Sequence, residues 1–134
     1  MNTKKGLVFF MEDDGVIRKK YTEFLEKNGF VVKESCNGKE GCCCLKAAQK
    51  STVFPEVIIM DLIMPKMDAI DVLERIKKHE GCNKIPVIVM SESESREDRM
   101  QILSMGADEF LLKSELTPEI LMDAIKKVTT SVVE

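Results

Sequence analysis

Short apolar runs alternate along the chain with longer segments of helical periodicity. Four runs are apolar throughout: Leu7–Met11, Val57–Met60, Val87–Met90 and Phe110–Leu112. A continuous apolar run bounded by polar residues is typical of a strand that is buried on both faces, as in a parallel sheet. A fifth run, Phe30–Lys33, is polar by its end and is predicted to form an edge strand.

After each predicted strand, the apolar residues recur with the period of an α-helix. Asn28-Gly29 is predicted to end the first helix and Gly106 the fourth, because glycine readily adopts the conformation that terminates helices. The second helix is predicted from about residue 38 to 50. The apolar stripes of the other helices are Ile17, Tyr21, Phe24 and Leu25; Ala69, Val72, Leu73 and Ile76; Ile102 and Leu103; and Leu121, Ala124, Ile125 and Val128. The predicted caps of helices two to five are Asn37, Asp68, Ser95 and Thr117.

Five strand–helix pairs in succession predict an α/β fold of the (βα)₅ type. Right-handed crossovers would wind the helices onto both faces of a parallel sheet, giving a doubly wound domain. At 134 residues the chain is too short for a second domain to be expected, so we predict a single domain over residues 1–134. If the chain is complete, its output would be a change of its own surface or onward transfer of a chemical group.

Composition narrows the possible partners and location. Twenty basic and 23 acidic residues give a net charge of −3, which does not indicate binding to nucleic acid or to an acidic membrane. The longest apolar run, Leu7–Met11, is too short to cross a bilayer, and we expect no signal peptide before it. Five cysteines, three of them consecutive (Cys42–Cys44), indicate reduced thiols, so a cytoplasmic location is predicted.

Polar residues follow four of the predicted strands at their carboxyl ends. In an open α/β sheet, ligands bind beyond these ends, so side chains from separate strands are expected to meet in one crevice. The residues concerned are Glu12, Asp13 and Asp14 after the first strand, Asp61 after the third, Ser91 after the fourth and Lys113 after the fifth.

These residue types together indicate a phosphate and magnesium site. Clustered carboxylates repel one another unless they share a proton or hold a cation, and Mg²⁺ prefers such oxygen ligands while leaving room for phosphate. Ser91 and Lys113 could bind the oxygens of a phosphoryl group. Asp61 stands alone after a central strand and is the best candidate for a nucleophile that carries an aspartyl phosphate, with Glu12 and Asp13 left to hold the metal.

At these positions the sequence resembles the receiver domain of two-component response regulators, particularly single-domain receivers of the chemotaxis-regulator type. The resemblance covers residues from about 5 to 130. It rests on the segments Val57–Asp68, Met11–Asp14 with Arg18, Pro86–Ser91 and Gly106–Lys113. It implies a flavodoxin-like sandwich whose five-stranded parallel sheet has the order 2-1-3-4-5.

The resemblance also implies a role for each site residue. Asp61 would accept a phosphoryl group from a phosphohistidine, carried by a sensor histidine kinase or a histidine phosphotransfer protein. The implied Mg²⁺ ligands are Glu12, Asp13, Asp61 and the backbone carbonyl of Ile63. Ser91 and Lys113 would bind the phosphoryl group, and Ser91 and Phe110 would act as switch residues that signal to an unknown downstream protein.

Four positions depart from the family pattern. Ser114 stands where a proline usually follows the lysine through a cis bond, so the Lys113–Ser114 bond is either strained or trans with a rearranged loop. Lys66 and Ala69 replace glycines, and Lys66 would add a positive charge near the site. Glu92 replaces a small residue after Ser91, where its bulk and charge would hinder access and repel a phosphoryl group.

Other interpretations remain open at this point. Asp14 is compatible with a charge at a helix start, and Phe110 with an ordinary core residue. A receiver-like fold with altered positions 66, 69, 92 and 114 could be an interaction module that works without phosphorylation. A third possibility is a magnesium-dependent phosphatase with an aspartyl nucleophile, which would need a second acid two residues after Asp61, where the chain has Ile63. We therefore expect a phosphoacceptor rather than an enzyme with external substrates.

Overall fold

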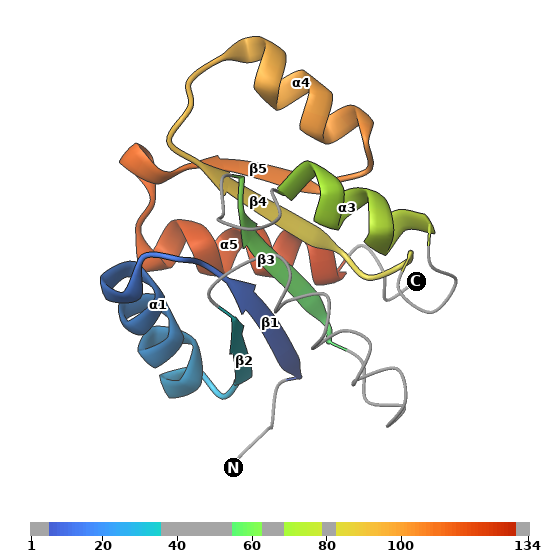
Figure 1. Ribbon diagram of the computed structural model, residues 1–134. Coiled ribbons are helices and arrows are strands. Elements are labelled where there is room, and N and C mark those ends of the chain that lie inside the picture. Colours follow the sequence, from blue (N-terminus) through green and yellow to red (C-terminus); the bar gives the residue numbers. More distant parts are fainter. Residues whose placement is uncertain (1–5, 36–54, 63–68, 79–82, 131–134) are drawn as a thin grey trace.

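The five predicted strands form one parallel sheet. The computed structural model describes residues 6–35, 55–62, 69–78 and 83–130. The strands are β1 (Leu7–Met11), β2 (Val31–Ser35), β3 (Val57–Asp61), β4 (Val87–Ser91) and β5 (Glu109–Leu112). Their order across the sheet is β2-β1-β3-β4-β5, and every neighbouring pair is parallel (Figure 1). The predicted fold class and strand order are confirmed.

Helices cover both faces of this sheet. They are α1 (Gly15–Lys27), α3 (Ala69–Lys78), α4 (Arg96–Ser104) and α5 (Pro118–Thr130), with a 3₁₀ turn, η1, at Lys113–Glu115. Helices α1 and α5 pack on one face, and α3 and α4 pack on the other (Figure 1). The helix predicted for residues 38 to 50 lies outside the described residues. None of the described helices combines the length and apolar character needed to cross a membrane.

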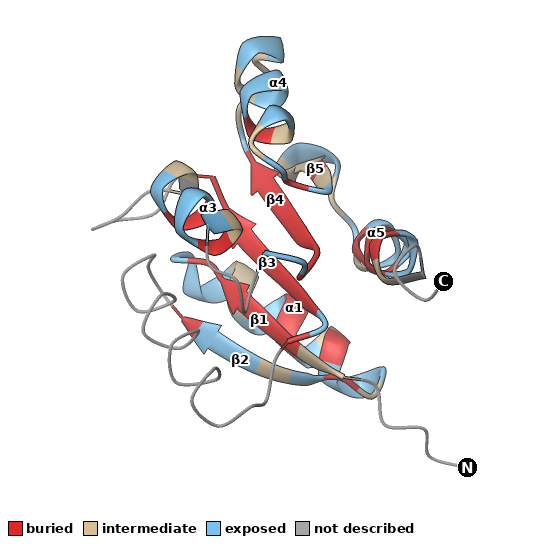
Figure 2. Cartoon of the chain, turned by 90° about the vertical axis from the view of Figure 1, so that its right-hand side faces the viewer, coloured by how far each residue is buried: buried red, intermediate tan, exposed pale blue. Residues whose placement is uncertain are grey.

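The central strand β3 and its neighbour β4 are buried along their whole length. Every residue of β3 and of β4 is buried, whereas β2 at the edge of the sheet is mostly exposed (Figure 2). Alternate strand residues enter two apolar layers, one under α3 and α4 and one under α1 and α5. A strand that faces two layers needs apolar residues at successive positions, which explains the unbroken runs in the sequence.

Local capping signals set the helix boundaries. The Asp14 side chain accepts hydrogen bonds from the backbone at the start of α1, Ser95 caps α4, and Thr117 accepts one from the backbone N–H of Ile120 in α5. Gly29 and Gly106 follow α1 and α4 with φ angles of 95° and 109°, the left-handed conformation that favours glycine. These predicted starts and stops are confirmed, and Asp14 proves to be a helix cap.

Candidate functional site

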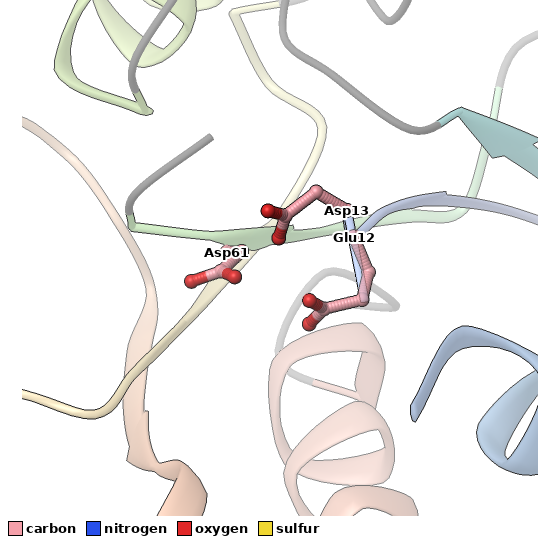
Figure 3. Close-up of side chains that lie close together, drawn as sticks. All are labelled: Glu12, Asp13 and Asp61. Atoms are coloured by element: carbon pink, nitrogen blue, oxygen red, sulfur yellow. The ribbon is translucent and has the colours of Figure 1, made fainter. Parts of the chain in front are cut away.

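Three carboxylates meet where β1 and β3 end. β1 and β3 are adjacent and pair in parallel register, with Met11 opposite Met60, so the residues that follow lie side by side. Glu12, Asp13 and Asp61 each offer an oxygen, and these three oxygens lie within 4.8 Å of one another (Figure 3). Glu12 and Asp61 are buried, while Asp13 is exposed and open to an incoming ligand.

Glu12 is a fully buried acid with incompletely satisfied oxygens. Its Oε2 accepts hydrogen bonds from the Asp14 backbone N–H at 3.1 Å and from Lys113 Nζ at 3.0 Å. Its Oε1 lies 2.9 Å from the same ammonium group but receives no hydrogen bond from the described residues. The net pKa of Glu12 is raised to about 7. Burial is the main cause and the nearby charge of Asp61 adds to it, while the hydrogen bonds from Lys113 and the Asp14 backbone oppose the rise. A bound cation would stabilise the charged carboxylate.

Lys113 supplies the positive charge of the site. Its Nζ lies 2.7 Å from Asp61 Oδ2, and the lysine side chain is only 9% exposed. Burial lowers the pKa of Lys113, but the hydrogen bonds to Asp61 and Glu12 outweigh that effect and the net direction is upward. The ammonium group therefore keeps its proton at neutral pH and can neutralise an anion at this position.

The sequence left open whether the Lys113–Ser114 peptide bond is cis and strained or trans. The described part of the chain contains no cis peptide bond, so Lys113 and Ser114 are joined in trans. The chain continues as the 3₁₀ turn η1, which the sequence pattern did not predict. Despite this rearranged loop, Lys113 reaches both carboxylates, as the predicted site requires.

Ser91 is held by the loop between β4 and α4. Its side chain is buried, and its Oγ accepts a hydrogen bond from the backbone N–H of Ser93 at 2.9 Å. Ser93 Oγ donates to Asp98 Oδ2 at 2.7 Å and accepts from the Ser95 backbone N–H at 3.1 Å. Ser93 is not among the predicted site residues; its only signal in the sequence is the alternation of serines at 91, 93 and 95.

The remaining predicted residues are distributed around this centre. Phe110 is buried in the layer under α3 and α4, and it also lines a cavity of about 360 Å³ beside Ser93. Glu92 is exposed directly after Ser91. Arg18 donates a hydrogen bond to the backbone carbonyl of Glu12, so it supports the acidic loop from α1. Ile63, Lys66 and the cysteines at 42–44 lie outside the described residues.

The donor set fits a divalent cation such as Mg²⁺. Three carboxylate oxygens from two strand ends converge, and the buried Oε1 of Glu12 lacks a hydrogen bond from the described residues. Hard cations take oxygen ligands of this kind. The lysine ammonium adjoins two of these carboxylates, Glu12 and Asp61.

Comparison with known proteins assigns the chain to a family. The model of the response regulator receiver domain matches residues 8–126. The chain therefore belongs to the response regulator receiver domain family, as the sequence motifs predicted. Its acidic pocket of Glu12, Asp13 and Asp61 has the composition expected of a receiver phosphoacceptor and magnesium site.

Two curated relatives illustrate the breadth of the family. The chain is 32% identical over 126 residues to the gliding motility regulatory protein of Myxococcus xanthus, covering 94% of this chain and 16% of that protein. It is 33% identical over 122 residues to the probable transcriptional regulator ycf29 of Porphyra purpurea, covering 90% and 55%. The chain thus spans less than two thirds of the length of either relative.

Solved structures agree with this fold. The receiver domain of a signal transduction histidine kinase from Syntrophus aciditrophicus has a TM-score of 0.81 at 25% identity, covering 97% of this chain and 94% of that one. The chemotaxis protein CheY4 of Vibrio cholerae has a TM-score of 0.80 at 26% identity, covering 92% and 98%. Both share the doubly wound receiver architecture.

Proposed function

We propose that this receiver domain is a signalling switch that accepts a phosphoryl group on Asp61. The observation that carries the proposal is the position of Asp61, which has an oxygen within 4.8 Å of oxygens of Glu12 and Asp13 and lies 2.7 Å from Lys113 Nζ. A carboxylate oxygen of Asp61 attacks the phosphorus of a phosphohistidine. The phosphorus–nitrogen bond breaks, and the leaving imidazole of the donor takes up a proton.

Charge neutralisation is the main contribution of the surrounding residues. Mg²⁺, held by Glu12, Asp13 and Asp61 with the backbone carbonyl of Ile63 as a further ligand, would supply a positive charge to the phosphoryl oxygens. Lys113 supplies a second positive charge, and the Ser91 hydroxyl donates a hydrogen bond. The Ser93 N–H occupies a lone pair of Ser91 Oγ, which leaves the hydroxyl proton for the phosphoryl group.

The partners of this reaction follow from the family. A sensor histidine kinase or a histidine phosphotransfer protein would present the phosphohistidine, and a downstream protein would read the modified surface through Ser91 and Phe110. The domain would therefore act as a phosphoacceptor and not as an enzyme with an external substrate. The cytoplasmic location and the single-domain organisation expected from the sequence stay predictions.

Covalent labelling tests this function directly. The protein is incubated with Mg²⁺ and phosphoramidate, and intact mass is followed in time. We expect one phosphate per chain in a base-labile adduct, no adduct in Asp61→Asn, and an unchanged adduct in the matched control Asp123→Asn, an exposed aspartate on α5. No adduct in the wild-type protein would reject the proposal.

A phospho-independent interaction module is the second candidate. It is favoured by the exposed anion Glu92 directly beside Ser91, where a phosphoryl donor has to approach. This candidate requires that Asp61→Asn and wild-type protein show the same surface and the same partners in the presence of Mg²⁺ and phosphoramidate. Turnover of external phosphate esters would instead identify a phosphatase.

A further inference from the structure

The 3₁₀ turn that carries Lys113 has a serine after the lysine, without the ring that would restrict the backbone in a proline. Ser114 and Glu115 are exposed, so the middle of the 3₁₀ turn contributes little to the core. The turn closes through a hydrogen bond from the Leu116 backbone N–H to the Lys113 carbonyl at 3.3 Å. Serine also lacks the ring that fixes φ in proline, so this backbone depends more on contacts from elsewhere in the fold.

One such contact comes from α1. The hydroxyl of Tyr21 donates a hydrogen bond to the Leu116 carbonyl at 3.3 Å, across 95 residues of sequence. Tyr21 is 4% exposed and packs in the same apolar layer as Leu116. Burial raises the pKa of Tyr21, with a further contribution from the charge of Glu119, so the hydroxyl keeps its proton and remains a donor.

We infer that Tyr21 is a positioning residue for Lys113. It fixes Leu116, Leu116 closes the turn on Lys113, and the turn aims the ammonium group at Asp61. Helix α1 begins at Gly15, and its cap Asp14 directly follows Glu12 and Asp13, so the helix that carries Tyr21 is also connected to the acidic residues of the site. This inference rests on the proposed function of Asp61 and Lys113 and adds the residue that aligns them.

Removal of the tyrosine hydroxyl tests the inference kinetically. Tyr21→Phe keeps the buried ring and deletes the hydrogen bond, and we expect a roughly two- to ten-fold slower phosphorylation by phosphoramidate, the range for one such bond. The matched control is Thr22→Val on the same helix, because Thr22 Oγ1 is buried without a hydrogen-bond partner among the described residues. The control should be phosphorylated at the wild-type rate. An equal rate in wild-type protein and Tyr21→Phe would overturn the inference.

A double-mutant cycle separates positioning from a general loss of stability. In a Lys113→Ala background the hydroxyl has no ammonium group to align, so adding Tyr21→Phe should leave the residual rate unchanged. Slowing by the same factor in both backgrounds would show that Tyr21 acts independently of Lys113 and would contradict the inference.

The chain also provides its own optical probe of this contact. Tyr21 is its single tyrosine and there is no tryptophan, so the intrinsic emission comes from this residue. In the unmodified protein, Lys113→Ala should release the turn and change the Tyr21 emission. Lys84→Ala, an exposed lysine just before β4, should leave the emission unchanged. Unchanged emission in Lys113→Ala would overturn the inference without any phosphorylation step.

These measurements distinguish failure of the proposed function of Asp61 from failure of the positioning role of Tyr21. A wild-type protein that takes up no phosphoryl group would reject the proposed function, and the emission of Lys113→Ala would then still decide whether Tyr21 and Lys113 are linked. A protein that is phosphorylated equally well with and without the Tyr21 hydroxyl would reject only the positioning role.

Discussion

At the scale of single residues, Glu12 shows how burial prepares an acid for a cation. The carboxyl group is fully buried and paired with Lys113, yet burial still holds its pKa near 7. In the absence of a cation, the native protein therefore keeps a proton on Glu12 that the unfolded chain would lose at lower pH.

This difference predicts how stability depends on pH. With a pKa of about 7 when folded and 4.5 as its reference value, Glu12 contributes stability that is complete below pH 4.5 and lost as the pH rises through 7. Urea unfolding in metal-free buffer should thus show a free energy of unfolding lower by about 3 kcal/mol at pH 8 than at pH 4 from this group alone. Glu12→Gln should remove that part of the slope.

The control for this experiment is Glu23→Gln, an exposed glutamate on α1. It should retain the wild-type pH dependence, so that the difference between the two variants isolates Glu12. Parallel slopes for wild-type protein and Glu12→Gln would contradict the prediction.

Glu92 gives a second prediction at this scale. Its exposed carboxylate lies directly after Ser91 and repels an anionic donor that approaches Asp61. Glu92→Ala should therefore be phosphorylated by phosphoramidate a few-fold faster at low ionic strength, with the difference shrinking at about 1 M salt as charges are screened. The matched control is Glu94→Ala, because Glu94 is also exposed and lies two residues after Glu92 in the chain. Rates that are equal in wild-type protein and Glu92→Ala at low salt would refute this role.

At the scale of elements, most boundaries could be predicted because local chemistry determines them. Asp14, Ser95 and Thr117 cap helices through bonds to backbone groups two or three residues away, and such contacts are visible in the sequence. The turn η1 could not be predicted in this way. Leu116, the residue that caps the turn, accepts a hydrogen bond from Tyr21, which is distant in the sequence and near only in the fold.

The backbone conformation of Gly106 predicts a loss of stability when this residue is substituted. Its φ of 109° is unfavourable for other residues, and an added Cβ would lie 3.1 Å from the side chain of Lys77. Gly106→Ala should lower the free energy of unfolding by about 1 kcal/mol or more in urea titrations. Gly15→Ala is the control, because its Cβ would meet only Arg18 Nη2 at 3.7 Å and its φ lies outside the left-handed region. A stability loss of equal size in both variants would argue against backbone strain at Gly106.

At the scale of the whole molecule, the parallel sheet creates the site. Strands β1, β3, β4 and β5 all end at the same edge, where Lys113 contacts Glu12 and Asp61 from a distant part of the chain and Ser91 ends the neighbouring strand β4. The site therefore exists only in the folded state, and a cation that binds there stabilises the whole domain.

Magnesium should accordingly raise thermal stability. At 100 times its dissociation constant, a ligand that binds only the native state adds about 2.7 kcal/mol to the free energy of unfolding. We expect Mg²⁺ to raise the melting temperature of the wild-type protein at pH 8, measured by circular dichroism. The rise should be much smaller in Asp13→Asn and unchanged in Asp123→Asn. The same rise in Asp13→Asn and wild-type protein would show that Mg²⁺ binds elsewhere.

The α/β class, the buried strands and the identity of the acidic, hydroxyl and lysine residues could all be predicted from the sequence. Apolar runs, helical stripes and caps depend on neighbouring residues and can be interpreted without a fold. Three features come only from the three-dimensional structure: the trans bond after Lys113, the hydrogen bond from Ser93 to Ser91, and the contact of Tyr21 with Leu116. The first two are local, but the residue types alone allow more than one backbone conformation at these loops. The third joins residues 95 positions apart, and only the packing of the helices on the sheet brings them together.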